Sequence, residues 1–334
     1  MSTMNVETPA AIPGTSNLMK LSLVALLVLA LVAPFGLYPI FLMKALCFAL
    51  FAAAFNLLLG YGGLLSFGHA AFFGGAAYIA AHVVKVWGWP PEVGLAAGTA
   101  VAAVMGVVIG WLAIRRQGIY FAMVTLALAQ MVYFVALEVK FTHGEDGIQA
   151  VPRGKFLGFL DLSDTNTMYY FVLAVCGLAF WLIYRTIHSP FGQVLKAIRE
   201  NEPRAISLGY RVEHYKLLAF TLSAALAGLA GSLKALVFQL ASLTDVDWRM
   251  SGQVVLMTLV GGVGTVFGPV VGAFILVTME NYLAQFGSWV TVIQGFIFVI
   301  CVLTFRKGIV GEITELIRRA RGEKASGGGG GGHH

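Results

Sequence analysis

The sequence predicts an all-α fold, a polytopic transmembrane bundle of about ten helices with broken or re-entrant elements. Three observations carry this prediction. Hydrophobic residues make up 58% of the chain and charged residues only 11%, against roughly 25% charged in an ordinary soluble chain. The charges leave long gaps, and a helix needs about 20 apolar residues to cross a membrane. Glycine and proline then interrupt two of these gaps, which predicts helix breaks inside the bundle.

The expected spans follow the runs that contain no Asp, Glu, Lys or Arg. These runs are 21–43, 45–84, 93–114, 117–137, 165–184, 250–279 and 281–305. Residues 216–240 supply a further span. The first run is long and lacks a small-residue cleavage site, so we expect a retained helix rather than a cleaved signal peptide. Cys47, Cys176 and Cys301 lie inside apolar runs without metal-like spacing, so no metal site and no disulfide is predicted.

The charge distribution predicts the orientation of the spans, because cytoplasmic loops collect Lys and Arg. Basic clusters occur at Arg115–Arg116, between residues 185 and 216, and in the tail 306–326. Residues 138–166 are acid-rich and are expected to form a periplasmic loop. The prediction is a multi-pass protein of a bacterial inner membrane with both termini cytoplasmic. Its parts are an N-terminal segment 1–17, a transmembrane domain 18–305, an amphipathic basic tail 306–326 and a tag remnant 327–334.

Parity resolves the longest runs. If the second basic cluster and the tail share one side, an even number of spans must separate them. Residues 216–240 and the last charge-free run supply one span each, so residues 250–279 must cross twice or nearly so. The length agrees, since 30 residues rise about 45 Å. Gly261–Pro269 breaks this run, and residues 250–260 are short enough for a half-helix or re-entrant element, which membranes tolerate where protein buries it. Gly60–Gly63 divides residues 45–84 in the same way.

The cytoplasmic loop 188–215 is predicted to contain two short helices. Gly192–Arg199 has an amphipathic pattern. A second helix, Pro203–Leu208, follows Asn201 as a possible cap and ends at Gly209. Isolated helices this short are marginal in water, so they need either a partner or packing against their own chain. Spacing alone supports two interpretations of this loop equally, an element that binds a partner and a solvated loop held by its own chain.

Several motifs in this chain resemble one family. Glu202–Gly209 is similar to the coupling segment of ABC importer permeases, in which an alanine precedes a glycine by four residues, as Ala205 precedes Gly209. Further stretches resemble the branched-chain amino-acid permeases of the LivM type, namely Gly60–Gly74, Gly118–Ala127 and Gly261–Gly272. The resemblance covers roughly residues 42–309. It departs at Thr142–Gly144, where many relatives have a second glycine, in the loop expected to meet a binding protein.

The resemblance implies a permease domain in a five-part machine. Its other parts are a homologous second permease subunit, two ATPase subunits and a periplasmic substrate-binding protein. The implied ATPase-coupling residues are Glu200, Asn201, Glu202, Pro203, Arg204, Ala205 and Gly209. No G-x-x-x-x-G-K-[ST] phosphate loop occurs in the sequence, so ATP and Mg²⁺ are expected on the partners, with no cofactor and no catalytic residue on this chain. The expected contacts otherwise are with the lipid bilayer, and no nucleic acid is expected.

The implied substrates are leucine, isoleucine and valine, with urea, short amides or aromatic carboxylates as alternatives, because selection would lie largely in the binding protein. Polar residues within spans are costly unless they have a role or a partner. The candidate pathway residues are Asn56, Ser66, His69, Tyr120, Thr125, Gln130, Gly261 and Gly264.

Three of these candidates have a second interpretation. His69, expected one turn into its helix, is either a pathway residue or a hydrogen-bonded packing residue. Tyr120 is a gate or an interfacial tyrosine, and Gly261–Pro269 exposes backbone to the substrate or forms a tight turn. No charged residue is expected at a helix centre, which disfavours an ion-coupled secondary transporter. An integral-membrane enzyme is disfavoured as well, since no suitable pair of catalytic side chains occurs in one leaflet.

Overall fold

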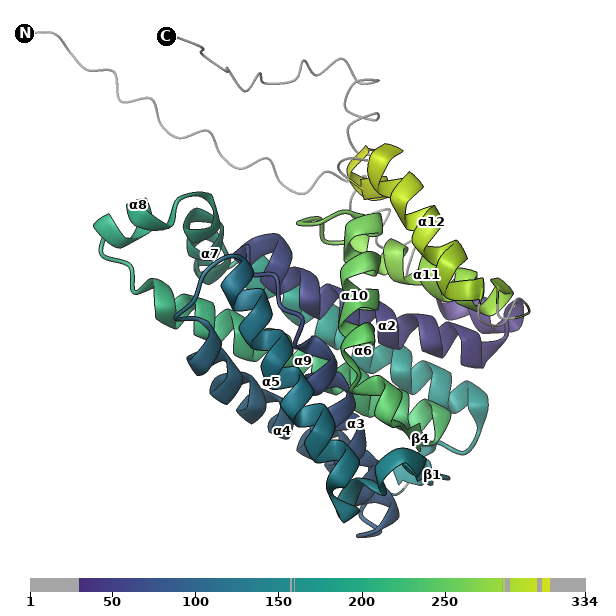
Figure 1. The fold of residues 1–334 in the computed structure, drawn as a ribbon. Coiled ribbons are helices and arrows are strands. Elements are labelled where there is room, and N and C mark those ends of the chain that lie inside the picture. Colours follow the sequence, from purple (N-terminus) through teal and green to yellow (C-terminus); the bar gives the residue numbers. More distant parts are fainter. Residues whose placement is uncertain are drawn as a thin grey trace, which may run out of the picture.

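The computed structural model describes residues 30–156, 158, 160–283, 285, 289–304 and 308–312. The expected N-terminal segment 1–17, most of the tail 306–326 and the tag remnant 327–334 lie outside the described residues. The described part is a helical bundle (Figure 1). Its helices are α2 (Pro39–Asn56), α3 (His69–Lys85), α4 (Pro91–Ala113), α5 (Ile119–Glu138), α6 (Thr165–Ile187), α7 (Pro190–Glu200), α8 (Glu202–Ser207), α9 (Val212–Phe238), α10 (Trp248–Gly261), α11 (Gly268–Leu283) and α12 (Trp289–Thr304).

The predicted membrane bundle is confirmed. Five helical stretches of the described chain are long and apolar enough to cross a membrane: Pro39–Tyr61, Pro91–Ala113, Ile119–Glu138, Thr165–Ile187 and Val212–Phe238. The first of these is α2 extended by a π-helical turn, Leu57–Tyr61. Together with α3 and α10 to α12, the described residues supply nine bundle helices, close to the expected ten.

The two predicted breaks are present. Helix α10 has 14 residues and α11 has 16, and residues 262–267 between them are not helical. At about 1.5 Å per residue neither covers the roughly 30 Å of a hydrocarbon core. The second break lies between Tyr61 and His69. The helix α3 therefore begins at His69, so the prediction that this residue lies one turn into its helix is wrong. The reason is that the break is longer than expected and extends through Gly62–Gly68.

The first expected span also has different boundaries. The run 21–43 was separated from 45–84 because Lys44 carries a charge, but a turn at Gly36 and Leu37 ends the first helical segment and Lys44 lies inside α2. Its ammonium is 3.2 Å from a Glu280 carboxylate oxygen in α11. The other oxygen of that carboxylate accepts a hydrogen bond from Gln253 of α10 at 3.0 Å. A partner 236 residues away thus makes the charge tolerable within the helix.

Small residues allow α3, α4 and α9 to pack closely at the centre of the bundle. A Cβ atom on Gly98 of α4 would lie 2.8 Å from the carbonyl oxygen of Ala76 in α3. Gly231 of α9 lies directly against the carbonyl of Phe73. Close backbone approach through small residues is the usual way in which membrane helices associate. Helices α2 and α9 are mostly buried, whereas α4, α5 and α6 carry many of the exposed apolar side chains.

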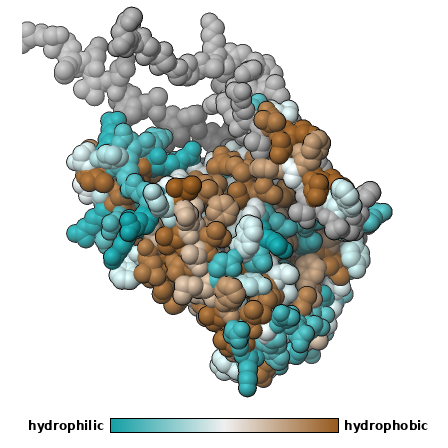
Figure 2. All heavy atoms as spheres, in the orientation of Figure 1, coloured by the Kyte–Doolittle hydropathy of each residue, from teal (hydrophilic) through white to brown (hydrophobic). Residues whose placement is uncertain are grey.

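The two ends of the bundle differ in structure. Helices α7 and α8 lie at one end, and β1 (Ile148–Gln149) and β4 (Leu240–Ala241) pair antiparallel at the opposite end (Figure 1). A second antiparallel pair joins β2 (Lys155–Phe156) to β3 (Leu160–Asp161). Figure 2 shows apolar atoms over the face of α4 and α5 and hydrophilic atoms at the α7–α8 end. The described part of the loop 138–166 therefore lies at the end away from the loop 188–215, and which end faces the cytoplasm stays a prediction.

Candidate functional site

Helices α7 and α8 form where the sequence predicted two short helices. Ser189 caps α7 by accepting a hydrogen bond from the Gly192 amide, and Pro190 occupies its first turn. The buried residues of α7 include Leu195 and Ile198, so its amphipathic face packs against the chain itself. The helix is longer than expected, Pro190–Glu200 instead of Gly192–Arg199, because the serine cap and the proline start it two residues earlier.

Helix α8 has the predicted cap, Asn201, but it spans Glu202–Ser207 instead of Pro203–Leu208. The Asn201 Oδ1 atom accepts a hydrogen bond from the Arg204 amide at 3.0 Å, which satisfies one of the free donors at the helix start. Gly209 has φ of +86°, a left-handed conformation that glycine adopts without strain. Ala205 is buried between Ile198 of α7 and Val212 of α9.

An ion pair fixes α8 to the long helix α9. The Lys216 ammonium lies 2.7 Å from both carboxylate oxygens of Glu202, and the lysine is buried. This contact and the apolar packing of Ala205 join the coupling segment to the core of the bundle. The side chains of Ile206, Leu208 and Tyr210 remain exposed, Leu208 to 69%. Exposed apolar side chains at a polar end are typical of a surface that a protein partner covers.

Helix α7 also contacts the broken part of α2. An Arg199 guanidinium nitrogen (Nη1) donates a hydrogen bond to the carbonyl oxygen of Gly60, in the π-helical turn. Leu195 lies against Gly62, and Arg199 lies against Gly63, whose φ of +69° favours glycine. The side chains of α7 therefore hold the segment 60–63 by direct packing and by one charged hydrogen bond.

Asn56 links the same turn to the α10–α11 loop. Its Nδ2 atom donates to the Thr265 carbonyl at 2.8 Å, and its Oδ1 atom accepts from the Gly264 amide at 2.9 Å. Asn56 is only 3% exposed. A Cβ on Gly60 would lie 2.6 Å from the Gly264 nitrogen, so the two backbones come this close because Gly60 has no side chain. We call the contacts of Arg199, Gly60, Asn56, Gly264 and Thr265 the α7–loop joint.

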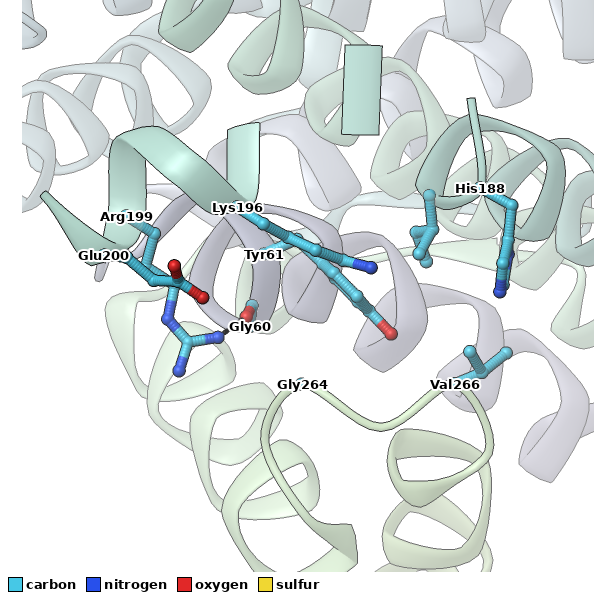
Figure 3. A pocket seen from close by; sticks show the side chains of 9 residues that line it. Gly60, Tyr61, His188, Lys196, Arg199, Glu200, Gly264 and Val266 are labelled. Carbon is cyan, nitrogen blue, oxygen red and sulfur yellow. Dashed lines mark hydrogen bonds between the residues drawn. The ribbon is translucent and has the colours of Figure 1, made fainter. Parts of the chain in front are cut away.

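A cavity of about 270 Å³ lies beside the joint (Figure 3). Its lining residues come from the end of α2, the end of α6, helix α7 and the α10–α11 loop: Gly60, Tyr61, Ile187, His188, Lys196, Arg199, Glu200, Gly264 and Val266. The Lys196 ammonium is 5.4 Å from the centre of the Tyr61 ring, within the range of a cation–π contact.

The predicted pathway residues fall into three groups. Asn56 and Gly264 meet in the joint, and Gly261 ends α10 with its backbone against the carbonyl of Gly268. Ser66, His69 and Thr125 are buried around the start of α3. Tyr120 and Gln130 lie on α5, Tyr120 at 68% exposure. Tyr120 and Gln130 are therefore separate from the joint.

The second group is held by hydrogen bonds within the protein. The His69 Nε2 atom is 2.8 Å from the Ser223 hydroxyl of α9, and the rings of Phe55, Phe72 and Phe220 meet the imidazole edge to face. Thr125 accepts a hydrogen bond from the Phe67 amide at 3.2 Å. These contacts favour the packing interpretation of His69.

Sequence reasoning did not single out Gly60, Tyr61, Lys196, Arg199 or Lys216 as site residues. Lys196 and Arg199 were visible as basic residues of the loop 188–215, next to Glu200. Gly60 was visible as a helix breaker. Nothing local indicated that Arg199 would bond to Gly60, because 139 residues separate them. Within the described chain, no group of three or more His, Cys, Asp or Glu side chains could hold a metal ion.

Comparison with known proteins gives one family and several relatives. Residues 38–302 match the family described as branched-chain amino acid transport system / permease component. The high-affinity branched-chain amino acid transport system permease protein LivM of Escherichia coli (strain K12) is 28% identical over 351 residues, which cover 94% of this chain and 81% of that relative. The ribose import permease protein RbsC of Bacillus subtilis (strain 168) is 30% identical over 54% of this chain and 58% of its own length.

A shorter similarity connects the chain to another transport permease. The autoinducer 2 import system permease protein LsrC of Salmonella typhi is 28% identical over 53% of this chain and 50% of its own length. No solved structure is significantly similar to the chain. The similarity over nearly the full length is thus to an amino-acid permease, and the matches to RbsC and LsrC cover about half of the chain.

Proposed function

Because the chain belongs to the family of permease components of branched-chain amino acid transport systems, we propose that it is the membrane subunit of an ATP-driven importer of leucine, isoleucine and valine. The substrate class rests on the similarity to a branched-chain amino acid permease over 94% of the chain. The direction of transport and the ATP dependence rest on the coupling segment Glu202–Gly209. The proposed partners are a second permease subunit, two ATPase subunits with their ATP and Mg²⁺, and a periplasmic substrate-binding protein.

The α7–loop joint is the observation that carries the mechanism. The chain has no phosphate loop, so energy from ATP must reach it as movement of a partner. In the proposed mechanism an ATPase subunit contacts the exposed side chains of Ile206, Leu208 and Tyr210. Movement of α8 then passes to α7, and through Arg199 and Gly60 to the end of α2. Asn56 passes it to the α10–α11 loop.

The α10–α11 loop is a suitable element to respond to such movement. Helices α10 and α11 are too short to cross a membrane alone, and broken helices tend to line binding sites and pathways in transporters. Shifting residues 262–267 would open or close the bundle at the α7 end while α9 and α3 stay packed. This gives alternating access without a tight substrate site along the transport pathway, since the binding protein would supply selection.

The test is ATPase activity of the co-purified complex in lipid, with and without substrate and binding protein. We expect stimulation by leucine, isoleucine or valine, and loss of stimulation in Ala205→Glu. The buried contact of Ala205 with Ile198 and Val212 cannot accept a carboxylate. Gly209→Glu should act similarly, because φ is +86° there. Assembly is checked by co-purification of the ATPase subunits.

Other results would reject parts of the proposal. Stimulation by urea, a short amide or an aromatic carboxylate alone would keep the machine and refute the amino-acid substrate. If the chain transports down an ion gradient without any ATPase subunit, the importer proposal is refuted altogether.

A further inference from the structure

The cavity beside the α7–loop joint has a charged side and an apolar side. In Figure 3, Arg199 and Glu200 lie at one side, His188 and Val266 at the other, and Lys196 and Tyr61 between them. Its volume of about 270 Å³ is slightly below the roughly 300 Å³ at which pockets for drug-sized ligands begin. It therefore suits a small metabolite that carries both charged and apolar groups.

The charged side presents both signs. Lys196 and Glu200 are four residues apart on α7 and Arg199 lies between them, so the three side chains share one side of the helix. Arg199 is fixed by its hydrogen bond to Gly60. No ion pair within 4 Å joins Lys196 or Glu200 to another side chain of the described residues. An ammonium and a carboxylate thus line one cavity with hydrogen-bonding capacity left for a ligand.

This arrangement is complementary to a free α-amino acid with an apolar side chain. The ligand carboxylate would meet the Lys196 ammonium and the Arg199 guanidinium, and charge-assisted hydrogen bonds of this type are the strong ones. The ligand ammonium would meet the Glu200 carboxylate. Ile187, Val266 and the Tyr61 ring supply apolar contact for a branched side chain. A phosphate group fits less well, because Glu200 would repel it.

We propose that this cavity binds the transported branched-chain amino acid from the side on which α7 lies, and that its binding slows the importer. The inference rests on the proposed function, since it takes the ligand to be the transported product. A ligand seated here touches α7 on one side and the α10–α11 loop on the other. It would hold these elements at their present separation and oppose the movement that the joint transmits. Accumulated product would thus limit its own import.

The experiment uses the complete complex in proteoliposomes, with the binding protein and labelled leucine outside and ATP inside. The initial uptake rate is measured with unlabelled leucine, isoleucine or valine preloaded inside. We expect preloading to slow uptake and the ATPase activity together. 4-Methylpentanoate, which lacks the ammonium, and leucinamide, which lacks the carboxylate, should need at least about tenfold higher concentrations for the same inhibition.

Two variants test the cavity, each compared with its own rate without preloading. Lys196→Gln and Glu200→Gln should each raise the half-inhibiting leucine concentration at least about tenfold. The matched control is Glu213→Gln, which removes an exposed carboxylate from the first turn of α9, outside the cavity. We expect this control to keep the sensitivity of the original complex. If all three variants keep the half-inhibiting leucine concentration of the original complex, the proposal is overturned.

The remaining outcomes separate the inference from the function on which it rests. If the complex imports leucine but preloaded leucine has no effect, the cavity proposal is wrong and the importer stands. If preloaded inorganic phosphate inhibits as well as leucine, the site is an anion site and the proposal is wrong. If the complex imports no branched-chain amino acid at all, both fail.

If a variant does not assemble, the proposal is tested by photolabelling of the original complex. The complex is irradiated with a diazirine analogue of leucine. Labelling of residues 60–61, 187–200 or 264–266 supports the cavity, and labelling confined to other segments refutes it.

Discussion

Asn56 joins the end of α2 to the α10–α11 loop by two hydrogen bonds, and the substitution Asn56→Leu would remove both. Leucine has a similar length and no hydrogen-bonding group. It would leave the Gly264 amide and the Thr265 carbonyl without their present partner. We expect transport to lose its coupling to ATP hydrolysis, because the loop would no longer follow the movement of α7 and α2.

The size of the effect follows from the burial of this contact. Asn56 is 3% exposed, and leaving a buried donor or acceptor unpaired costs about 1–3 kcal/mol. Two unpaired groups give about 2–6 kcal/mol if both stay dry, and less if water enters from the neighbouring cavity. A loss of about 2 kcal/mol already lowers the population of the joined arrangement roughly 30-fold.

The assay measures leucine import and ATP hydrolysis in the same proteoliposomes, and expresses coupling as leucine moved per ATP hydrolysed. The ratio should fall at least about tenfold in Asn56→Leu, while the ATPase subunits still co-purify. The control is Thr99→Val, which removes a hydroxyl whose one hydrogen bond among the described residues goes to the Leu95 carbonyl of its own helix, at 2.8 Å. An unchanged ratio and an unchanged melting temperature in Asn56→Leu would refute the role assigned to this contact.

Three further substitutions test other contacts. Lys216→Met leaves the Glu202 carboxylate without its partner, and we expect a loss of about 1–3 kcal/mol in stability and less co-purified ATPase, partly restored by adding Glu202→Gln. Gly98→Leu would force α4 away from an α3 carbonyl and should abolish the monodisperse peak in size-exclusion chromatography, whereas Gly177→Leu, in open space, should not. A backbone hydrogen bond lowers the pKa of Asp164. The Asp164 carboxylate caps the start of α6 by accepting a hydrogen bond from the Thr167 amide, and this cap is present at neutral pH and lost in acid. Hydrogen-exchange protection at the start of α6 should therefore fall only as the pH falls through the lowered pKa.

Local rules of chain chemistry were sufficient for the elements that the sequence predicted well. The cap at Asn201, the helix after it and its end at Gly209 depend on residues within nine positions of one another. The break within Gly261–Pro269 likewise depends on neighbouring glycines and a proline. The number and apolarity of the spans follow from charge-free length, which is a one-dimensional property.

Contacts between distant segments explain what the sequence could not predict. Asn56 and Thr265 are 209 positions apart, and both are ordinary residues in their local setting. An unpaired charge is costly in a membrane, so the sequence predicts the boundary of a span at Lys44. The structure pairs it with Glu280, so the boundary moved to Gly36 and Leu37. The cavity needs four separate segments to meet, and no pattern in any one of them reveals it.

The coupling segment is attached to the bundle at two places, and both attachments are needed for movement to reach the α10–α11 loop. The attachment to α9 combines the ion pair of Lys216 and Glu202 with the buried packing of Ala205. The attachment to the α10–α11 loop runs through the hydrogen bonds of Arg199 and Asn56 and through the packing of α7 side chains against the end of α2. A hydrogen bond to a charged group contributes about 1.5–3 kcal/mol, and separating the buried Asn56 from its partners would leave polar groups unpaired. We therefore expect the joint to hold while the importer works, so that the α10–α11 loop follows the movement of α7 and α8.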